Sequence, residues 1–291
     1  MKKRVLSLFF SFLIVLGSVG AFLFYQSHSE TSPAPAQVSE CPLLFVSWNI
    51  VDLGRSKSDD LIETIAEILQ YADIVALQEV TAGKNFGAQA IKRLVQELLQ
   101  KGSSWDYVVS DPTSGPGSER YAYLLRNGVT FSRDDAYLLK DLDQLIDREP
   151  YTLKVKLDQL PLVNLLTVHT VPTKKAPTTE VVALSEAEVV KTSERMIISG
   201  DFNLPGRVTD KIFEPLGYHG HVREKTSLKR SLDGQGGYRL HQYDNIYTKG
   251  VHVCESGVID FVSSKFSPVT NESLKEARKI SDHLPVYIRF R

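Results

Sequence analysis

The chain has 291 residues, of which 42% are hydrophobic and 24% charged, and its formal net charge is −1. This composition excludes a disordered or collagen-like chain, and two cysteines are too few for a disulfide-dense miniprotein. Because acidic and basic residues nearly balance, the chain is not a nucleic-acid binder that works by bulk positive charge, and an enzyme that binds phosphate locally stays open.

The first segment has the pattern of a sequence that directs export. Three basic residues at positions 2–4 precede the stretch Val5–Tyr25, which carries no charge. This length favours a retained membrane anchor over a cleaved signal peptide, and both stay open. Residues 26–40 are rich in Ser, Pro and Ala, which is typical of a linker. We therefore expect a domain over residues 41–291 that is periplasmic or extracellular, monomeric, and tethered to a membrane if residues 5–25 are retained.

The remaining residues predict an alternation of buried strands and helices. Apolar residues at helical spacing predict helices over Asp60–Tyr71, Gln89–Gln100 and Glu180–Thr192. Short apolar or alternating runs predict strands over Leu43–Trp48, Ile74–Leu77, Tyr121–Arg126, Tyr151–Leu157, Val163–Val168, Met196–Ser199, Asp244–Tyr247, Val258–Val262 and Leu284–Phe290. Many strands with few helices favour an α/β fold of two packed sheets flanked by helices over a single doubly wound sheet.

Cys41 and Cys254 are the only cysteines of the chain. In an oxidising compartment they can form one bridge between the start of the domain and a late segment. Their distance in the fold does not follow from the sequence, so a bridged pair and a free pair both stay open.

Polar residues able to do chemistry stand at the ends of the predicted strands. Catalytic groups collect where strands run into loops, because the strands fix them while the loops expose them. Carboxylate and amide oxygens suit Mg²⁺, Mn²⁺ or Ca²⁺, and histidines move protons near neutral pH. Each residue alone also fits an ordinary turn or helix cap, but their coincidence favours a site. The residues are Asn49, Glu79, His169, Asp201, Asn203, Asp282 and His283.

These strand ends carry an ordered set of motifs. The motifs are Ser-Trp-Asn49-Ile, Leu-Gln-Glu79-Val, Val-His169-Thr, Ser-Gly-Asp201-Phe-Asn203, Tyr-Asp244-Asn-Ile and Ser-Asp282-His283-Leu-Pro-Val. The set covers nearly all of residues 43–291 and resembles the endonuclease/exonuclease/phosphatase superfamily. Ser118-Glu119-Arg120-Tyr121 and Arg148-Glu149-Pro150 are similar to the deoxyribonuclease I branch in particular. The resemblance implies a four-layer α/β sandwich, with two mostly antiparallel sheets between helices, and a metal-dependent phosphodiester hydrolase.

The resemblance also implies a metal site built from oxygen ligands. Glu79 is expected to be the main ligand, with Asn49 and Asp282 close to the same ion. Asp201 and Asn203 are expected to orient the phosphate or the attacking water, or to hold a second ion. We expect Mg²⁺ as the cofactor, with Mn²⁺ or Ca²⁺ as alternatives.

Two histidine–carboxylate pairs complete the expected catalytic set. The resemblance pairs Glu119 with His169 and Asp244 with His283. A carboxylate at one ring nitrogen fixes the tautomer, so that the other nitrogen faces the substrate. We assign His283 as general base and His169 as general acid, on opposite sides of the phosphorus.

Other positions concern the substrate. Arg148 is expected to contact a substrate phosphate, unless it pairs with Glu149 on the surface. Where deoxyribonuclease I has arginines that enter the minor groove, this chain has Val51 and Thr81, and a tyrosine of that branch is Gly117. These departures weaken the expectation of duplex cutting. Other cations could take over the contacts of the missing arginines, or they could be solvated surface charges. These residues are Arg55, Lys57, Lys84, Lys229 and Arg230.

Together these features predict an exported, Mg²⁺-dependent nuclease that cuts DNA without sequence specificity. The alternative within the enzymes is a phosphodiesterase or phosphatase for lipid head groups or small phosphate esters. The alternative from another class is a non-catalytic binding module on the same fold, because a fold does not dictate a function.

Overall fold

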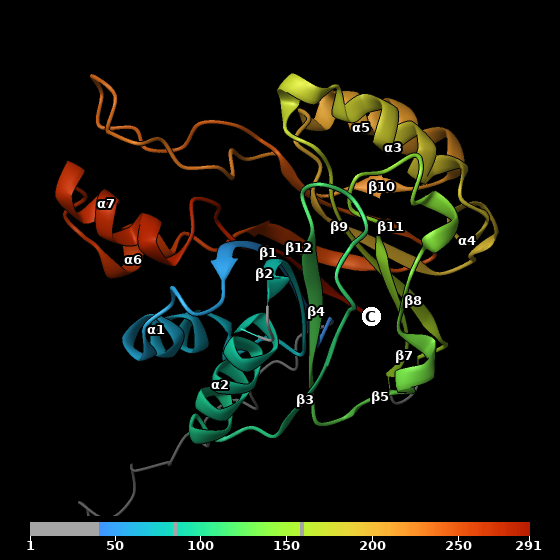
Figure 1. The fold of residues 1–291 in the computed structure, drawn as a ribbon, viewed down its shortest axis with the longest axis horizontal. Coiled ribbons are helices and arrows are strands. Elements are labelled where there is room, and N and C mark those ends of the chain that lie inside the picture. The colour runs from blue at the N-terminus through green and yellow to red at the C-terminus, as the bar shows by residue number, and fades with distance from the viewer. Residues whose placement is uncertain (1–40, 84–85, 158–159) are drawn as a thin grey trace, which may run out of the picture. The chain divides into compact units, whose positions relative to one another are not determined.

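Two β-sheets, which we call sheet A and sheet B, form the centre of the domain in the computed structural model (Figure 1). The structure describes residues 41–83, 86–157 and 160–291. Sheet A contains β1 (Leu43–Leu53), β2 (Ile74–Thr81), β3 (Trp105–Val109), β4 (Glu119–Arg126), β12 (Val253–Val258) and β13 (Val286–Phe290), in the order β12-β13-β1-β2-β4-β3. Sheet B contains β5 (Val129–Phe131), β6 (Tyr137–Leu138), β7 (Tyr151–Leu157), β8 (Val163–His169), β9 (Met196–Asp201), β10 (His219–Gly220) and β11 (Asp244–Lys249), in the order β10-β11-β9-β8-β7-β5, with β6 beside β7.

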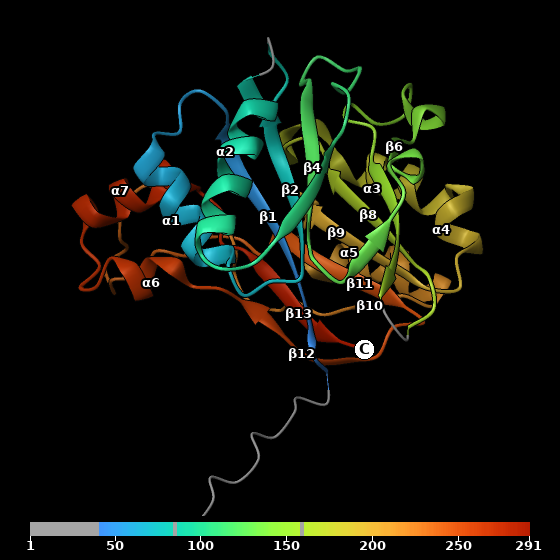
Figure 2. The same ribbon diagram turned by 90° about the horizontal axis from the view of Figure 1, so that it is seen from below.

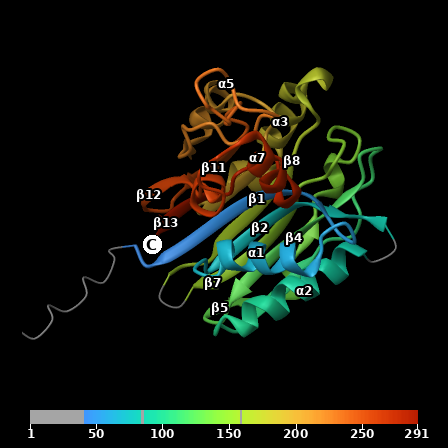
Figure 3. The same cartoon turned by 90° about the vertical axis from the view of Figure 1, so that its left-hand side faces the viewer.

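Helices cover the outer face of each sheet (Figures 1 and 2). Sheet A is covered by α1 (Asp59–Leu69), α2 (Phe86–Gln100), α6 (Phe261–Lys265) and α7 (Asn271–Ile280). Figure 3 shows α1 and α2 lying across its strands. Sheet B is covered by α3 (Pro177–Glu186), α4 (Glu188–Thr192) and α5 (Gly206–Phe213). Short 3-10 turns are η2 (Arg133–Asp135), η3 (Lys140–Leu142), η4 (Thr173–Lys175) and η5 (Glu214–Leu216).

This arrangement is the four-layer α/β sandwich expected from the sequence. Only the neighbours β1–β2 and β8–β9 are parallel, and the other strand pairs are antiparallel. One apolar cluster fills the space between the two sheets. A second lies between sheet A and its helices, and a third lies between sheet B and its helices. The predicted fold class is therefore confirmed.

The alternation of residues along β1 shows how the sandwich delivers a polar group to its interior. Successive strand residues face opposite sides of a sheet. Val46 and Trp48 pack towards the helices, whereas Phe45 packs between the sheets. Asn49, four residues beyond Phe45, therefore lies within β1 on the side that faces sheet B, at the point where the pairing with β2 shifts register. There its side chain contacts Asp201 of β9.

Some predicted elements were wrong or missing. Val258–Val262 is not a strand: β12 ends at Val258, and Asp260 caps α6 by accepting from the backbone N–H of Ser263 at 3.1 Å. The helix predicted over Glu180–Thr192 is two helices, because Ala187 has an extended ψ of 135° that separates α3 from α4. The elements β3, α5 and α7 were not predicted.

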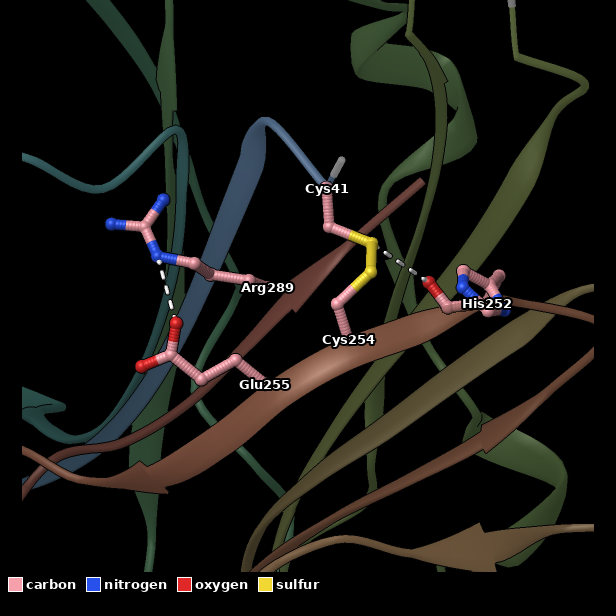
Figure 4. The surroundings of a disulfide bond; sticks show 5 residues. All are labelled: Cys41, His252, Cys254, Glu255 and Arg289. Atoms are coloured by element: carbon pink, nitrogen blue, oxygen red, sulfur yellow. Dashed lines mark hydrogen bonds and ion pairs between the residues drawn. A yellow bond between two sulfur atoms is a disulfide. The ribbon is translucent and has the colours of Figure 1, made fainter. Parts of the chain in front are cut away.

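The two cysteines are joined in a disulfide (Figure 4). It links Cys41, two residues before β1, to Cys254 in the edge strand β12, with 6.1 Å between their Cα atoms. An ion pair between Glu255 and Arg289 lies beside it, at 3.4 Å. The structure therefore contains the bridged pair rather than the free one.

The predicted anchor or signal at residues 1–25 and the predicted linker at residues 26–40 lie outside the described residues. Within the described ranges, no helix combines the length and apolar character needed to cross a membrane. The expected export and membrane attachment stay predictions.

Candidate active site

The ends of six strands meet at one edge of the sandwich and bring the predicted polar residues together. In sheet B, Asp201 pairs with both His169 on β8 and Asp244 on β11. In sheet A, Asn49 of β1 pairs with Gln78 of β2, the residue that precedes Glu79. Glu119, the first residue of β4, pairs with Thr81 of β2. His283 immediately precedes the segment that enters β13. Side chains from strands far apart in the sequence thus share one site.

Backbone irregularities aim two of these side chains into the site. The pairing of β1 with β2 shifts register after Asn49, and that of β2 with β4 shifts between Leu77 and Val80. Within the second shift Glu79 adopts a φ of 58°, which is unfavourable for a residue with a side chain. Bulges redirect side chains next to active sites, and strained backbone persists where function requires it. The sequence gives no signal of this conformation.

Glycine is required just before Asp201. Gly200 has a φ of 142°, and an added Cβ would lie only 1.9 Å from the carbonyl oxygen of Val168. The two parallel strands that carry Asp201 and His169 therefore approach closely only because residue 200 lacks a side chain.

The first histidine–carboxylate pair joins β8 to β4. Both carboxylate oxygens of Glu119 lie 3.0 Å from Nδ1 of His169. Burial alone would lower the pKa of His169, but the charge and hydrogen bond of Glu119 raise it overall, against an opposing effect of Arg148. With Nδ1 engaged, His169 presents Nε2 to the site.

The second pair joins β11 to the segment before β13. Nδ1 of His283 lies 2.7 Å from Oδ2 of Asp244. Burial alone would lower the pKa of His283, but the carboxylates of Asp244 and Asp201 raise it to about 10. His283 therefore carries a proton at neutral pH in the metal-free protein.

Asp201 lies between the two imidazoles. Its Oδ2 is 3.6 Å from Nε2 of His169 and 3.6 Å from Nε2 of His283. Its Oδ1 accepts the backbone N–H of Asn203 at 2.9 Å, and Asn203 has a φ of 48°. Burial acts to raise the pKa of Asp201, but the two histidines lower it overall, so the carboxylate is held ionised. The reactive nitrogens of both histidines therefore point to one place.

The oxygen atoms near Asp201 fit a hard divalent cation. The amide nitrogen of Asn49 donates to Glu79 at 2.9 Å and to Asp201 at 3.1 Å, while its buried carbonyl oxygen Oδ1 has no hydrogen-bond partner. An unpaired buried acceptor is costly, and a cation would satisfy it. Burial also raises the pKa of Glu79, which a nearby cation would counter. Asp201, Asp244 and His283 form a second group whose ligand atoms lie within 4.8 Å of one another.

Two predicted residues make contacts that the sequence did not suggest. The carboxylate of Asp282 accepts from Arg278 at 3.3 Å, so its role as a metal ligand stays a prediction. Arg148 is buried and donates to the carbonyl oxygens of His169 at 2.9 Å and Thr170 at 2.6 Å. The surface pair with Glu149 is absent, because Glu149 binds Lys140 instead, at 2.7 Å. Arg148 thus supports the end of β8, and its contact with a phosphate stays a prediction.

Sequence reasoning missed a residue that supports the segment leading to His283. Lys57, considered a surface cation, is buried, and burial lowers its pKa to about 8. Its Nζ donates to the carbonyl oxygens of Lys279 at 2.7 Å and Ile280 at 2.8 Å. Lys57 therefore holds the C-terminal end of α7, directly before the Asp282–His283 motif. No sequence pattern marks this role.

Solved structures share this fold. The mannosyl-6-phosphatase of Bacteroides thetaiotaomicron superposes with a TM-score of 0.60 at 18% identity, covering 86% of this chain and 99% of that chain. TDP2 of D. rerio, complexed with single strand DNA product, superposes with a TM-score of 0.59 at 16% identity, covering 86% of this chain and 98% of that one. At these identities the likeness shows the fold alone.

Sequence comparison identifies closer relatives. No family model matches the chain. Deoxyribonuclease-1-like 1 of Sus scrofa is 31% identical, over 81% of this chain and 76% of the relative. Deoxyribonuclease I-like enzymes generally depend on a divalent metal. The chain therefore belongs to the deoxyribonuclease I-like family of the endonuclease/exonuclease/phosphatase superfamily and is an enzyme that hydrolyses phosphodiester bonds.

Proposed function

We propose that this enzyme is an exported, Mg²⁺-dependent nuclease that cuts DNA without sequence specificity. The observation that carries the proposal is the approach of both histidine Nε2 atoms to Asp201 at 3.6 Å, each with its Nδ1 held by a carboxylate. A relative named as a deoxyribonuclease supports DNA as the substrate. The disulfide supports an oxidising compartment, as expected for an exported protein.

The two histidines supply the proton transfers that the reaction needs. One must accept a proton from the attacking water, and the other must give a proton to the leaving oxygen. Their Nε2 atoms approach Asp201 from β8 and from the segment before β13, so they can serve opposite sides of a phosphorus held there. We keep His283 as the base and His169 as the acid. This order requires that the charge of Asp201 be neutralised first, because that charge helps to hold the pKa of His283 at about 10.

Glu79, Asn49 and Asp201 are the residues that would hold the cation. When bound, Mg²⁺ acts as a Lewis acid and offsets charge on the nonbridging phosphate oxygens. Asn203 is fixed for phosphate binding, because its side chain donates to the carbonyl oxygen of Thr170 at 3.0 Å and its backbone to Asp201. Arg148 keeps the end of β8, and hence His169, in place.

One observation favours a second activity. Val51 and Thr81 stand where deoxyribonuclease I has groove-binding arginines, so the grip on duplex DNA is reduced. Hydrolysis of lipid head groups or small phosphate esters is therefore the competing proposal.

The test uses the full-length protein with supercoiled plasmid and circular single-stranded DNA. Mg²⁺, Mn²⁺ and Ca²⁺ are compared with a chelator. Cleavage should require metal, and Glu79→Gln should raise the Mg²⁺ concentration for half-maximal rate at least about tenfold. Glu63→Gln, the same change on the exposed face of α1, is the matched control. Folded protein that cuts neither DNA but hydrolyses a small phosphate ester would overturn the nuclease proposal in favour of the competing one.

A further inference from the structure

A stacked aromatic pair lies on the segment that leads into Asp244, the partner of His283. The rings of His241 and Tyr243 are stacked, with centroids 4.5 Å apart and an angle of 16° between their planes. Tyr243 precedes Asp244, the partner of His283, and its hydroxyl accepts from Thr173 at 3.0 Å. His241 is exposed, whereas Tyr243 is half-buried. The pair therefore presents the exposed His241 ring on the segment that carries Asp244.

The backbone fixes this ring relative to the site. His241 lies in segment 222–243 between β10 and β11, coloured orange in Figure 1. Its carbonyl oxygen accepts from the backbone N–H groups of Thr226 at 2.6 Å and Ser227 at 3.0 Å. Its own N–H donates to the hydroxyl of Ser227 at 3.1 Å, and Ser227 pairs with His283 in a β-bridge. His241 is thus linked to His283 through Ser227.

Exposed cations flank the aromatic pair on two elements. Lys174 and Lys175 follow Thr173, which bonds to Tyr243. Lys225 precedes Thr226, which bonds to His241. In the described ranges 41–83, 86–157 and 160–291, these three lysines form no ion pair with a carboxylate. Unpaired cations beside a flat ring are the two components of a single-strand binding surface.

We propose that His241, backed by Tyr243, is a stacking subsite for an unpaired base next to the scissile phosphate, and that the enzyme acts on single-stranded DNA. This inference rests on the proposed nuclease function and specifies its substrate. A base in a duplex is covered on both faces by its neighbours, whereas an unpaired base can stack on an exposed ring. Lys174, Lys175 and Lys225 then contact the strand's phosphates. The missing groove arginines at Val51 and Thr81 agree with a substrate that has no groove.

The experiment compares two single-stranded oligonucleotides of equal length and charge. One carries thymine at every position, and the other is abasic throughout. Wild-type protein should hydrolyse the thymine strand with a kcat/KM about tenfold higher, since one stacked base contributes that order of affinity. His241→Ala should reduce this ratio to near one, and His241→Phe should restore it. His219→Ala removes another exposed histidine, on β10 opposite Thr248 near the far end of β11, and should keep the wild-type ratio.

Binding in the presence of chelator provides a readout that does not depend on turnover. The wild type should bind the thymine strand more tightly than the abasic strand, and His241→Ala should lose this preference. DNA hydrolysis with equal rates on both strands, or with a preference for duplex, would overturn the stacking subsite alone. Absence of hydrolysis on any DNA by folded protein would overturn the nuclease function and the subsite together.

Discussion

The two histidine–carboxylate pairs are built alike but lie in different electrostatic surroundings. In each, a carboxylate from one sheet holds Nδ1 of a histidine that belongs to the other side of the sandwich. The pKa of His169 is raised overall by Glu119, but the positive charge of Arg148 opposes this rise. His283 faces Asp244, Asp201 and Asp282, which raise its pKa to about 10. The same local motif thus gives two histidines whose pKa values are raised by different sets of neighbouring charges.

This difference teaches which part of the site depends on metal. The negative field that holds the proton on His283 comes partly from Asp201, which we propose as a cation ligand. Asp201 raises the pKa of both histidines from 3.6 Å, so a cation that neutralises it would lower both values, while Glu119 and Asp244 keep their contacts with Nδ1. What distinguishes the pairs is the positive charge of Arg148 beside His169, and the order of base and acid stays a proposal.

The largest expected effect comes from removing either imidazole. His169→Ala and His283→Ala should each lower kcat about 1,000-fold, because a positioned general acid or base contributes roughly 100- to 10,000-fold. Single-turnover rates on single-stranded DNA measure this, and circular dichroism checks the fold. A loss confined to one of the two variants would contradict a mechanism that uses both pairs.

A smaller effect is expected from the carboxylate partners. Glu119→Gln and Asp244→Asn keep the shape but remove the charge, and should lower kcat about 10- to 100-fold, the usual cost of losing an orienting partner. Asp244→Asn should also lower the pKa of His283, which NMR titration of the imidazole can follow. An unchanged His283 pKa in that variant would show that Asp244 is not its main electrostatic partner.

The smallest expected effect is on the pH dependence of stability in the metal-free protein. The folded pKa of His283 is raised to about 10 from an ordinary value near 6.5. Its contribution to the free energy of unfolding is therefore fully present below pH 6.5 and is lost as the pH rises towards 10. Urea denaturation in chelator should show this decline in the wild type and a flatter profile in His283→Gln. His219→Gln should follow the wild type.

The sequence predicted the parts of the fold that depend on regular patterns. Strands such as Val163–Val168 and Met196–Ser199 are apolar runs that end in polar residues, and the structure has β8 and β9 at these positions. Helices α5 and α7 were not predicted because each buries only three residues along one face, which leaves a weak apolar pattern. Val258–Val262 was wrong because an apolar run of this length fits a strand or a buried helix start equally well.

For the site, the sequence predicted which residues share an edge but not how they are supported. The contacts of Lys57 with Lys279 and Ile280 at the end of α7 span sequence separations of 222 and 223 positions, which no local pattern reveals. The left-handed φ of Glu79 is a property of the bulge and not of the residue type. The stacking of His241 on Tyr243 depends on the path of segment 222–243, which has little regular structure.

The Cys41–Cys254 bridge has a mechanical consequence. A pulling force that arrives along the chain at Cys41 divides between β1 and β12, because the disulfide passes part of the load to the edge strand. Asn49 lies eight residues further along β1 and would otherwise bear the full tension. The bridge therefore reduces the tension that a force applied at Cys41 transmits to Asn49.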